Sequence, residues 1–282
     1  MSYMDNASER EGTDAVKEDQ VEAMTIERPV VSIRDGGSGT VMDRVIREDI
    51  LRIVVNGETF VSLACLPESL EELAVGFLRS EGLIDSKDAV EAVEVDPAKR
   101  TVSVRGAIRK EMLEKSLSRR FLTSGCGIVP TGRDPGSLAD GCLKVKSDYV
   151  VGADTVLGLM HEVNTGCLLF NRTGAAHTAA LAVDGTLACV FEDISRHNAV
   201  DKVIGKALLE GWETSRGIIL SSGRLSLEIA IKCAAGGVPV VVSRTAPMQM
   251  ALEVADELLM TLVGFTRGRR MNVYTHPWRI RP

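Results

Sequence analysis

Apolar residues alternate with polar ones on both sides of Asn56-Gly57 in the first half of the chain. The alternation extends over residues 50–63, and Asn-Gly between two β-rich runs predicts a tight hairpin. The spacing of apolar residues then becomes helical over residues 70–78. Ser69-x-x-Glu72 before this stripe has the form of a capping box, and Gly82 after it suits a helix C-cap. The pattern therefore predicts a hairpin followed by a helix.

Shorter patterns complete this first unit. Two further strands are expected near residues 90–95 and 101–106, and a charged helix near 110–118. Residues 29–118 therefore form a predicted α+β N-terminal domain, in which we find no catalytic motif. Ahead of it, residues 1–28 contain eight acidic residues, three basic ones and no apolar run. That composition predicts a disordered acidic tail.

The regular pattern stops between residues 119 and 148, where glycine and proline are frequent. Such a density disfavours regular structure and is typical of a linker or a functional loop. Cys126 lies within this Gly/Pro-rich loop, in the run Thr-Ser-Gly-Cys-Gly.

Residues 149–282 return to apolar strands separated by amphipathic helices. Strands are expected at 179–183, 186–191, 217–220, 238–242 and from about 261, and helices at 197–209, around 227–234 and from about Pro247. This order predicts an α/β C-terminal domain with a mixed sheet, parallel in part. Ligands of such sheets bind beyond the carboxyl ends of the strands, which points to the loops at residues 221–224 and 243–246.

The composition argues against several classes of function. The net charge is −6 and only 4% of residues are aromatic, which disfavours nucleic-acid binding through phosphate neutralisation or base stacking. No apolar run approaches the ~20 residues that span a bilayer, so we expect no membrane segment and, without a secretion signal, a cytoplasmic protein. The six cysteines are widely spaced and fit reduced thiols. No CxxC or HExxH motif is present, so we expect no intrinsic metal.

Cys126 is the first candidate for chemistry. Its glycine neighbours leave the sulfur sterically open, and a thiol reacts only if its thiolate can form and can be reached. The alternative is a small hydrophobic residue that happens to lie in a loop. We interpret Cys167, Cys189 and Cys233 in that second way, because they lie in apolar strand or helix contexts.

An arginine segment after the last predicted strand is the second candidate. It comprises Phe265, Thr266, Arg267, Gly268, Arg269 and Arg270. Arginines at a strand end can bind phosphates through paired hydrogen bonds, and glycine lets backbone amides approach the ligand. A solvated basic edge is the alternative interpretation.

Two weaker candidates remain. Residues 195–198, Ser-Arg-His-Asn, precede a predicted helix and could meet an anion at its N-terminus. Serine or asparagine acting as a plain helix cap explains this motif equally well. We interpret His177 as a hydrogen-bonded structural histidine rather than a catalyst.

Longer motifs are distributed between about residues 45 and 277. They are LEELAVGFLRSEG at 70–82, SRHNAVDKVIG at 195–205, SGR at 222–224, SRTAP at 243–247, VGFTRGRR at 263–270 and NVYT at 272–275. Together they resemble the FdhD family, the sulfur carrier proteins or accessory sulfurtransferases of formate dehydrogenase. The SRHNAVDKVIG run is highly specific.

The resemblance implies a sulfurtransferase function. Members accept sulfur from a cysteine desulfurase as a cysteine persulfide. They pass it to the molybdenum of a bis(molybdopterin guanine dinucleotide) cofactor, bis-MGD, which apo formate dehydrogenase needs in sulfurated form. On this chain the persulfide position falls on Cys126, and the segment that binds the guanine nucleotide moiety falls on residues 265–270. A cytidine deaminase-like C-terminal domain without zinc chemistry and a homodimer are also implied.

The chain departs from the family pattern at three positions. Val129 replaces a second loop cysteine, and Ala175 and Ser195 replace glycines. Without the second thiol, Cys126 must carry the persulfide alone or borrow Cys142 from the same loop. Two alternative functions stay open. One is a chaperone that delivers bis-MGD without moving sulfur, and the other is a deaminase-like hydrolase, against which the missing zinc ligands argue.

Overall fold

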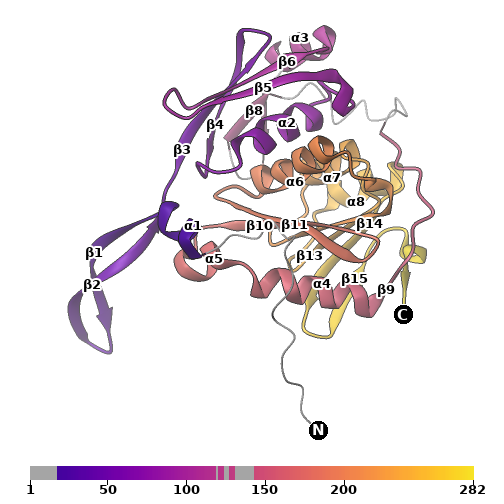
Figure 1. The fold of residues 1–282 in the computed structure, drawn as a ribbon. Coiled ribbons are helices and arrows are strands. Elements are labelled where there is room, and N and C mark those ends of the chain that lie inside the picture. Colours follow the sequence, from indigo (N-terminus) through magenta and orange to yellow (C-terminus); the bar gives the residue numbers. More distant parts are fainter. Residues whose placement is uncertain (1–17, 119, 124–126, 131–142) are drawn as a thin grey trace.

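The structure is a computed structural model that describes residues 18–118, 120–123, 127–130 and 143–282. Two units, each a sheet with helices, pack against each other through their helices, and a two-stranded arm projects beside them (Figure 1). The predicted α/β fold class is confirmed.

The first unit is a four-stranded sheet with the order β4-β3-β6-β5 and one long helix, α2, on its face. Its elements are β3 (Asp49–Val55), β4 (Glu58–Cys65), α2 (Leu70–Ser80), η1 (Lys87–Ala89), β5 (Val90–Asp96), β6 (Thr101–Gly106) and α3 (Lys110–Ser118). These bounds confirm the hairpin at Asn56-Gly57 and the predicted helices and strands. The capping-box prediction is wrong, because Ser69 has a left-handed backbone (φ 52°) and its side chain makes no cap hydrogen bond.

The second unit is a six-stranded sheet with the order β11-β10-β12-β13-β14-β15. The pairs β12–β13 and β13–β14 are parallel and the other pairs are antiparallel, so the sheet is mixed, as predicted. Its elements are β10 (His177–Val183), β11 (Thr186–Asp193), α6 (Arg196–Glu210), η3 (Thr214–Arg216), β12 (Gly217–Ser221), α7 (Leu227–Ala235), β13 (Val240–Ser243), α8 (Gln249–Glu257), β14 (Thr261–Arg267) and β15 (Arg270–Val273).

Helices cover both faces of this second sheet. Buried side chains of α6, α7 and α8 pack on one face, and those of α4 (Ala153–Thr165) pack on the other. Because side chains alternate along a strand, β12 directs Ile219 to the first face and Ile218 to the second. The remaining short elements are β9 (Val151–Gly152), α5 (Leu168–Thr173), η4 (Pro277–Arg279) and β16 (Ile280–Arg281), and β16 pairs parallel with β9.

Two expectations in the C-terminal half differ from the structure. Pro247 lies two residues before α8 rather than in its first turn. The strand that begins at Thr261 is not the last one, because β15 pairs antiparallel with it. The cause is Gly268, whose left-handed backbone (φ 57°) lets the chain reverse directly after β14.

Regular structure also occurs in the Gly/Pro-rich loop. β7 (Arg120–Thr123) and β8 (Gly127–Pro130) pair antiparallel. Both contain residue types with a high preference for strands, Phe and Thr in the first and Ile and Val in the second. Cys126 and Cys142 lie outside the described residues.

The predicted disordered tail does not extend to residue 28. Residues from 18 onward form α1 (Glu18–Ala23) and β1 (Thr25–Arg34), and β1 pairs with β2 (Gly37–Ile46) to make the projecting arm (Figure 1). Val21 and Met24 are buried against Leu66 and Leu169. The segment folds because these two side chains reach a cluster built by distant parts of the chain, a contact that the local acidic composition does not reveal.

Met24 should therefore contribute to stability although it lies close to the N-terminus. Only 3% of its surface is exposed, whereas Met42 on the arm is 59% exposed. We expect Met24→Ala to lower the free energy of unfolding by about 2–5 kcal/mol, as is typical of buried large-to-small substitutions. Met42→Ala, the matched control, should change it by less than about 0.5 kcal/mol. Urea unfolding measures both, and equal values would contradict the assigned burial.

The two units meet where α2 crosses α6. Gly76 and Gly205 let the helix backbones touch, since a Cβ at either position would overlap the backbone of the other helix. Beside this crossing, Asp201 of α6 accepts a hydrogen bond from the Ser80 hydroxyl at 2.6 Å and pairs with Lys232 at 2.7 Å. These contacts fix α6, and with it the site described next, against the first unit.

Candidate functional site

Loops that are distant in sequence meet at the carboxyl ends of the parallel strands. The chain leaves β12, β13 and β14 at this edge of the sheet. Because β10 is antiparallel to β12, with Ala179 opposite Ser221, the start of β10 lies at the same edge. The end of β11 joins it, with His177 opposite Asp193, and α6 begins three residues later. We call this edge, with the loops that follow β12, β13 and β14 and the first turn of α6, the strand-end site.

The arginine segment at residues 265–270 forms the outer wall of the strand-end site. It comprises the end of β14, a two-residue turn and the start of β15. Arg267, Arg269 and Arg270 are exposed, and none of them forms an ion pair with a described residue. The Nε of Arg267 donates to the carbonyl oxygen of Arg244 at 2.7 Å, which ties this turn to the loop after β13. Its guanidinium groups are therefore available to an anion.

Close backbone packing holds this turn in place. The Phe265 amide donates to the carbonyl oxygen of Thr245 at 2.9 Å. A Cβ at Gly264 would lie 2.8 Å from Pro247 and 3.0 Å from the Thr245 oxygen, so only glycine fits there. Thr266 is buried, and its hydroxyl has no hydrogen-bond partner within the described part of the chain. A small pocket beside the turn is lined by Thr266, Arg267, Gly268 and, from α4, His161 and Asn164.

The loops after β12 and β13 are bonded to each other. The Ser243 hydroxyl donates to the carbonyl oxygen of Gly223 at 2.6 Å and accepts from the Thr245 amide at 2.9 Å. The guanidinium of Arg244 lies 5.1 Å from the centre of the Phe170 ring, a cation–π contact. Both loops are thus held rigidly while Arg224 and Arg244 remain at the edge, as the rule for parallel strand ends predicts.

Ser195 is the N-cap of α6, so the helix-cap interpretation of this motif is confirmed. Its hydroxyl accepts from the His197 amide at 3.3 Å. Asp193 organises the turn: its carboxylate accepts from the amides of Ser195 and Leu66 and pairs with Lys202 at 2.8 Å. The contact with Leu66 comes from the first unit. Because Ser195 caps α6, Arg196 and His197 occupy the first turn of the helix, at the strand-end site.

Both histidines of the site are neutral at pH 7. His197 is buried, and that burial, with the nearby charges of Lys232 and Arg196, lowers its pKa to about 3. Burial also lowers the pKa of His177, and the charges of Arg196 and Arg244 add to the effect. His177 places Nδ1 3.3 Å from the Ser222 hydroxyl. The structural interpretation of His177 is correct for this contact, but the residue also lies among the arginines of the site.

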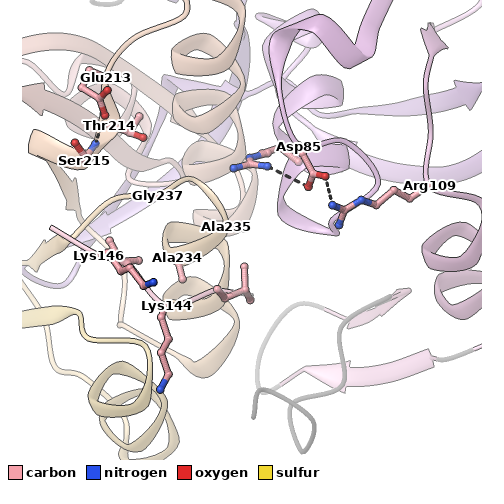
Figure 2. Close-up of a pocket in the computed structure, with 13 residues that line it drawn as sticks. Asp85, Arg109, Lys144, Lys146, Glu213, Thr214, Ser215, Ala234, Ala235 and Gly237 are labelled. Carbon is pink, nitrogen blue, oxygen red and sulfur yellow. Dashed lines mark hydrogen bonds and ion pairs between the residues drawn. The ribbon is translucent and has the colours of Figure 1, made fainter. Parts of the chain in front are cut away.

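A second hollow lies at the opposite ends of the strands, between the two units (Figure 2). This pocket has a volume of about 480 Å³, and Lys144 and Lys146 contribute to its wall. Asp85 pairs with both Arg79 and Arg109 there. One carboxylate offsets only one of the two guanidinium charges, and with Lys144, Lys146 and Glu213 the lining keeps a net positive charge. No motif in the sequence predicts this pocket.

The four described cysteines are buried. Burial raises the pKa of Cys65 to about 12, and it also raises the pKa of Cys167 and of Cys233. The structural interpretation of Cys167, Cys189 and Cys233 is confirmed by their burial. These thiols are therefore not exposed nucleophiles.

The described residues contain neither a cluster of metal-ligating side chains nor a membrane-spanning helix. No group of three or more His, Cys, Asp or Glu side chains in those ranges could hold a metal ion. Within the same ranges, no helix is both long and apolar enough to cross a membrane.

Comparisons with known proteins agree with the motifs. The model of the FdhD/NarQ family matches residues 46–281. The sulfur carrier protein FdhD of Bacillus subtilis is 36% identical over 260 residues, covering 92% of this chain and 98% of the relative. The protein of the same name from Shouchella clausii is 38% identical over 240 residues, covering 84% and 90%. The crystal structure of a formate dehydrogenase accessory protein from Desulfotalea psychrophila is 28% identical, with a TM-score of 0.75, and covers 92% of this chain and all of that one.

Proposed function

The chain belongs to the FdhD/NarQ family, and on that premise we propose that it is a sulfur carrier that serves formate dehydrogenase. In this proposal Cys126 accepts sulfur from a cysteine desulfurase, and the strand-end site binds bis-MGD, the substrate that receives the sulfur. One observation carries the proposal. The arginine turn, residues 265–270, is hydrogen-bonded to the loop after β13, and that loop is bonded to the loop after β12, so all three lie at one edge of the sheet. A homodimer belongs to the proposal through the family resemblance, and a cytoplasmic location through the widely spaced cysteines, which fit reduced thiols.

The strand-end site suits the nucleotide part of this substrate. Pyrophosphate groups need several hydrogen-bond donors, and guanidinium groups bind them through paired hydrogen bonds. The arginine turn supplies Arg267, Arg269 and Arg270, exposed on one short reversal of the chain. The buried, unpartnered Thr266 hydroxyl offers a further polar contact next to them. The residues therefore fit a guanosine diphosphate moiety, while the metal would remain outside for reaction with the carrier.

The sulfur transfer itself requires a thiolate. The Cys126 thiolate attacks the outer sulfur of the desulfurase persulfide, the S–S bond of the donor breaks, and the donor cysteine leaves as a thiolate. The sulfur carried on Cys126 is at the oxidation level of elemental sulfur. Its delivery to the metal as a sulfido ligand therefore takes up two electrons, which the proposal assigns to a thiol reductant.

Mass spectrometry of the purified protein after incubation with a cysteine desulfurase and cysteine tests the proposal. We expect a mass increase of one sulfur atom, located on the peptide that contains Cys126 and removed by a reductant. The chaperone alternative stays open because Val129 replaces the second loop cysteine. It predicts that the protein binds GDP but acquires no sulfur. A protein that acquires no sulfur and binds no GDP would contradict both functions.

Binding of the guanine nucleotide depends on the arginine turn. We expect the Arg267→Ala, Arg270→Ala double variant to bind GDP roughly 10²- to 10⁴-fold more weakly, since each charge-assisted hydrogen bond contributes about 1.5–3 kcal/mol. Arg34→Ala, a control at the exposed end of the arm, should bind as the wild type does. Calorimetry measures the affinities, and an unchanged affinity in the folded double variant would remove the assignment.

A further inference from the structure

We propose that His177 is a phosphate ligand of the strand-end site and that it takes up a proton when the nucleotide binds. The inference rests on the proposed function, because it assigns a role within the same site. The inference follows from the position of His177, the first residue of β10, at the strand-end site.

One side of the His177 ring is fixed and the other is open to a ligand. Nδ1 lies 3.3 Å from the Ser222 hydroxyl, which in turn accepts from the Thr178 amide at 2.9 Å. The hydroxyl can donate to Nδ1 or accept from it, so this contact persists in both protonation states. Nε2 makes no hydrogen bond with a residue that the structure describes. The ring is therefore oriented, with one nitrogen left for another partner.

Arginines from three different segments surround this ring. Arg196 belongs to the first turn of α6, Arg224 follows β12 and Arg244 follows β13, and each acts on His177 electrostatically. The Arg196 side chain packs against Gly223, where a Cβ would approach it within 2.8 Å. The cluster is thus a group of cations gathered by the fold, in a chain whose net charge is negative.

The charged neighbours set the proton state of His177 in the absence of ligand. Besides the three arginines, Asp193 on β11 and the imidazole of His197 on α6 face it. Burial and the arginines lower the His177 pKa and only Asp193 raises it, so the ring is neutral near pH 7. A phosphate held by Arg196, Arg224 and Arg244 adds negative charge and cancels part of their positive charge. The pKa of His177 then rises, and the protonated ring can donate to a phosphate oxygen through Nε2.

The sign of the pH dependence follows. The ligand-bound state holds the extra proton below its raised pKa, whereas the free state holds it only below its lowered pKa. Between these two values, binding takes up a proton, and the affinity for the nucleotide increases as the pH falls. Above the raised pKa, the contribution of His177 is lost.

Nuclear magnetic resonance of the histidine Cε1 protons tests this on the wild-type protein. The chain has four histidines, and single His→Gln variants assign their signals. We expect saturating GDP to raise the pKa of His177 by at least about one unit, which corresponds to about tenfold tighter binding at low pH. His276, which contacts Asp256, serves as the reference and should not shift. A His177 pKa that GDP leaves unchanged would overturn the inference.

Calorimetry of variants provides a second, independent readout. Measurements in buffers of different ionisation enthalpy count the protons taken up. The terminal phosphate of GDP also titrates, near pH 6, so the quantity compared is the difference between proteins. We expect His177→Gln to lose the additional proton uptake of the wild type. Its affinity for GDP should equal that of His276→Gln at high pH and should be lower at low pH. If GDP binds the wild type and both variants identically at all pH values, the inference fails while the proposed function stands. If GDP does not bind the wild type, both fail.

Discussion

Replacement of Gly205 by alanine is expected to destabilise the protein strongly, although alanine is the better helix former. A Cβ at Gly205 would overlap the carbonyl oxygen of Glu72 and approach the amide nitrogen of Gly76. The two helices would have to separate, and overpacking of a close contact costs about 1–3 kcal/mol and occasionally more. Separation would also stretch the buried hydrogen bond from Ser80 to Asp201 and the contact of Lys232 with the Phe77 ring. We therefore expect a loss of about 3 kcal/mol or more in the free energy of unfolding.

Gly158 provides a matched control for this substitution. It lies inside α4, and a Cβ there would meet no atom within 4 Å. Gly158→Ala should stabilise the protein by up to about 1 kcal/mol through helix propensity alone. The same chemical change is thus expected to have opposite signs at two helical positions. Urea unfolding of both variants checks this, and a Gly205→Ala protein as stable as the wild type would show that the helices are not in backbone contact.

Local patterns were sufficient to predict most of the secondary structure. The hairpin at Asn56-Gly57 follows from two adjacent residues, and the helices from apolar spacing within one segment. The burial of Val21 and Met24 could not be predicted in this way, because their partners, such as Leu169, are far away in the sequence. The supposed capping box at Ser69 failed for a related reason: the chain enters α2 with a left-handed residue, a geometry that the motif does not encode.

The sequence predicted the segments of the strand-end site better than their arrangement. The loops after β12 and β13 and the arginine segment follow from the rule for the ends of parallel strands. The position of His177 depends instead on the antiparallel pairing of β10 with β12, and apolar patterns do not distinguish that pairing from a parallel one. Asp193, which connects α6 to Leu66, carries no motif signal, since its importance arises from contacts between the two units.

Cys126→Ala is expected to abolish both persulfide formation and the activation of apo formate dehydrogenase. Among the described thiols, burial raises the pKa of Cys65 to about 12, which leaves roughly one molecule in 10⁵ as thiolate at pH 7. Cys233 is fully buried and its pKa is raised as well. No such thiol can replace an accessible nucleophile. The loss of activity should therefore be complete rather than partial, while GDP binding at the arginine turn, a separate segment of the chain, stays close to the wild-type value.

Cys142→Ala serves as the control, because Cys142 belongs to the same Gly/Pro-rich loop. With Val129 in place of a second cysteine, no neighbouring thiol at that position can release the carried sulfur as a disulfide. The persulfide on Cys126 should therefore persist, and Cys142→Ala should retain both sulfur loading and activation. Equal loss in the two variants would mean that Cys142 takes part in the transfer. If Cys126→Ala activates formate dehydrogenase as well as the wild type does, the protein does not transfer sulfur through Cys126. Its function would then be to deliver bis-MGD without sulfur transfer.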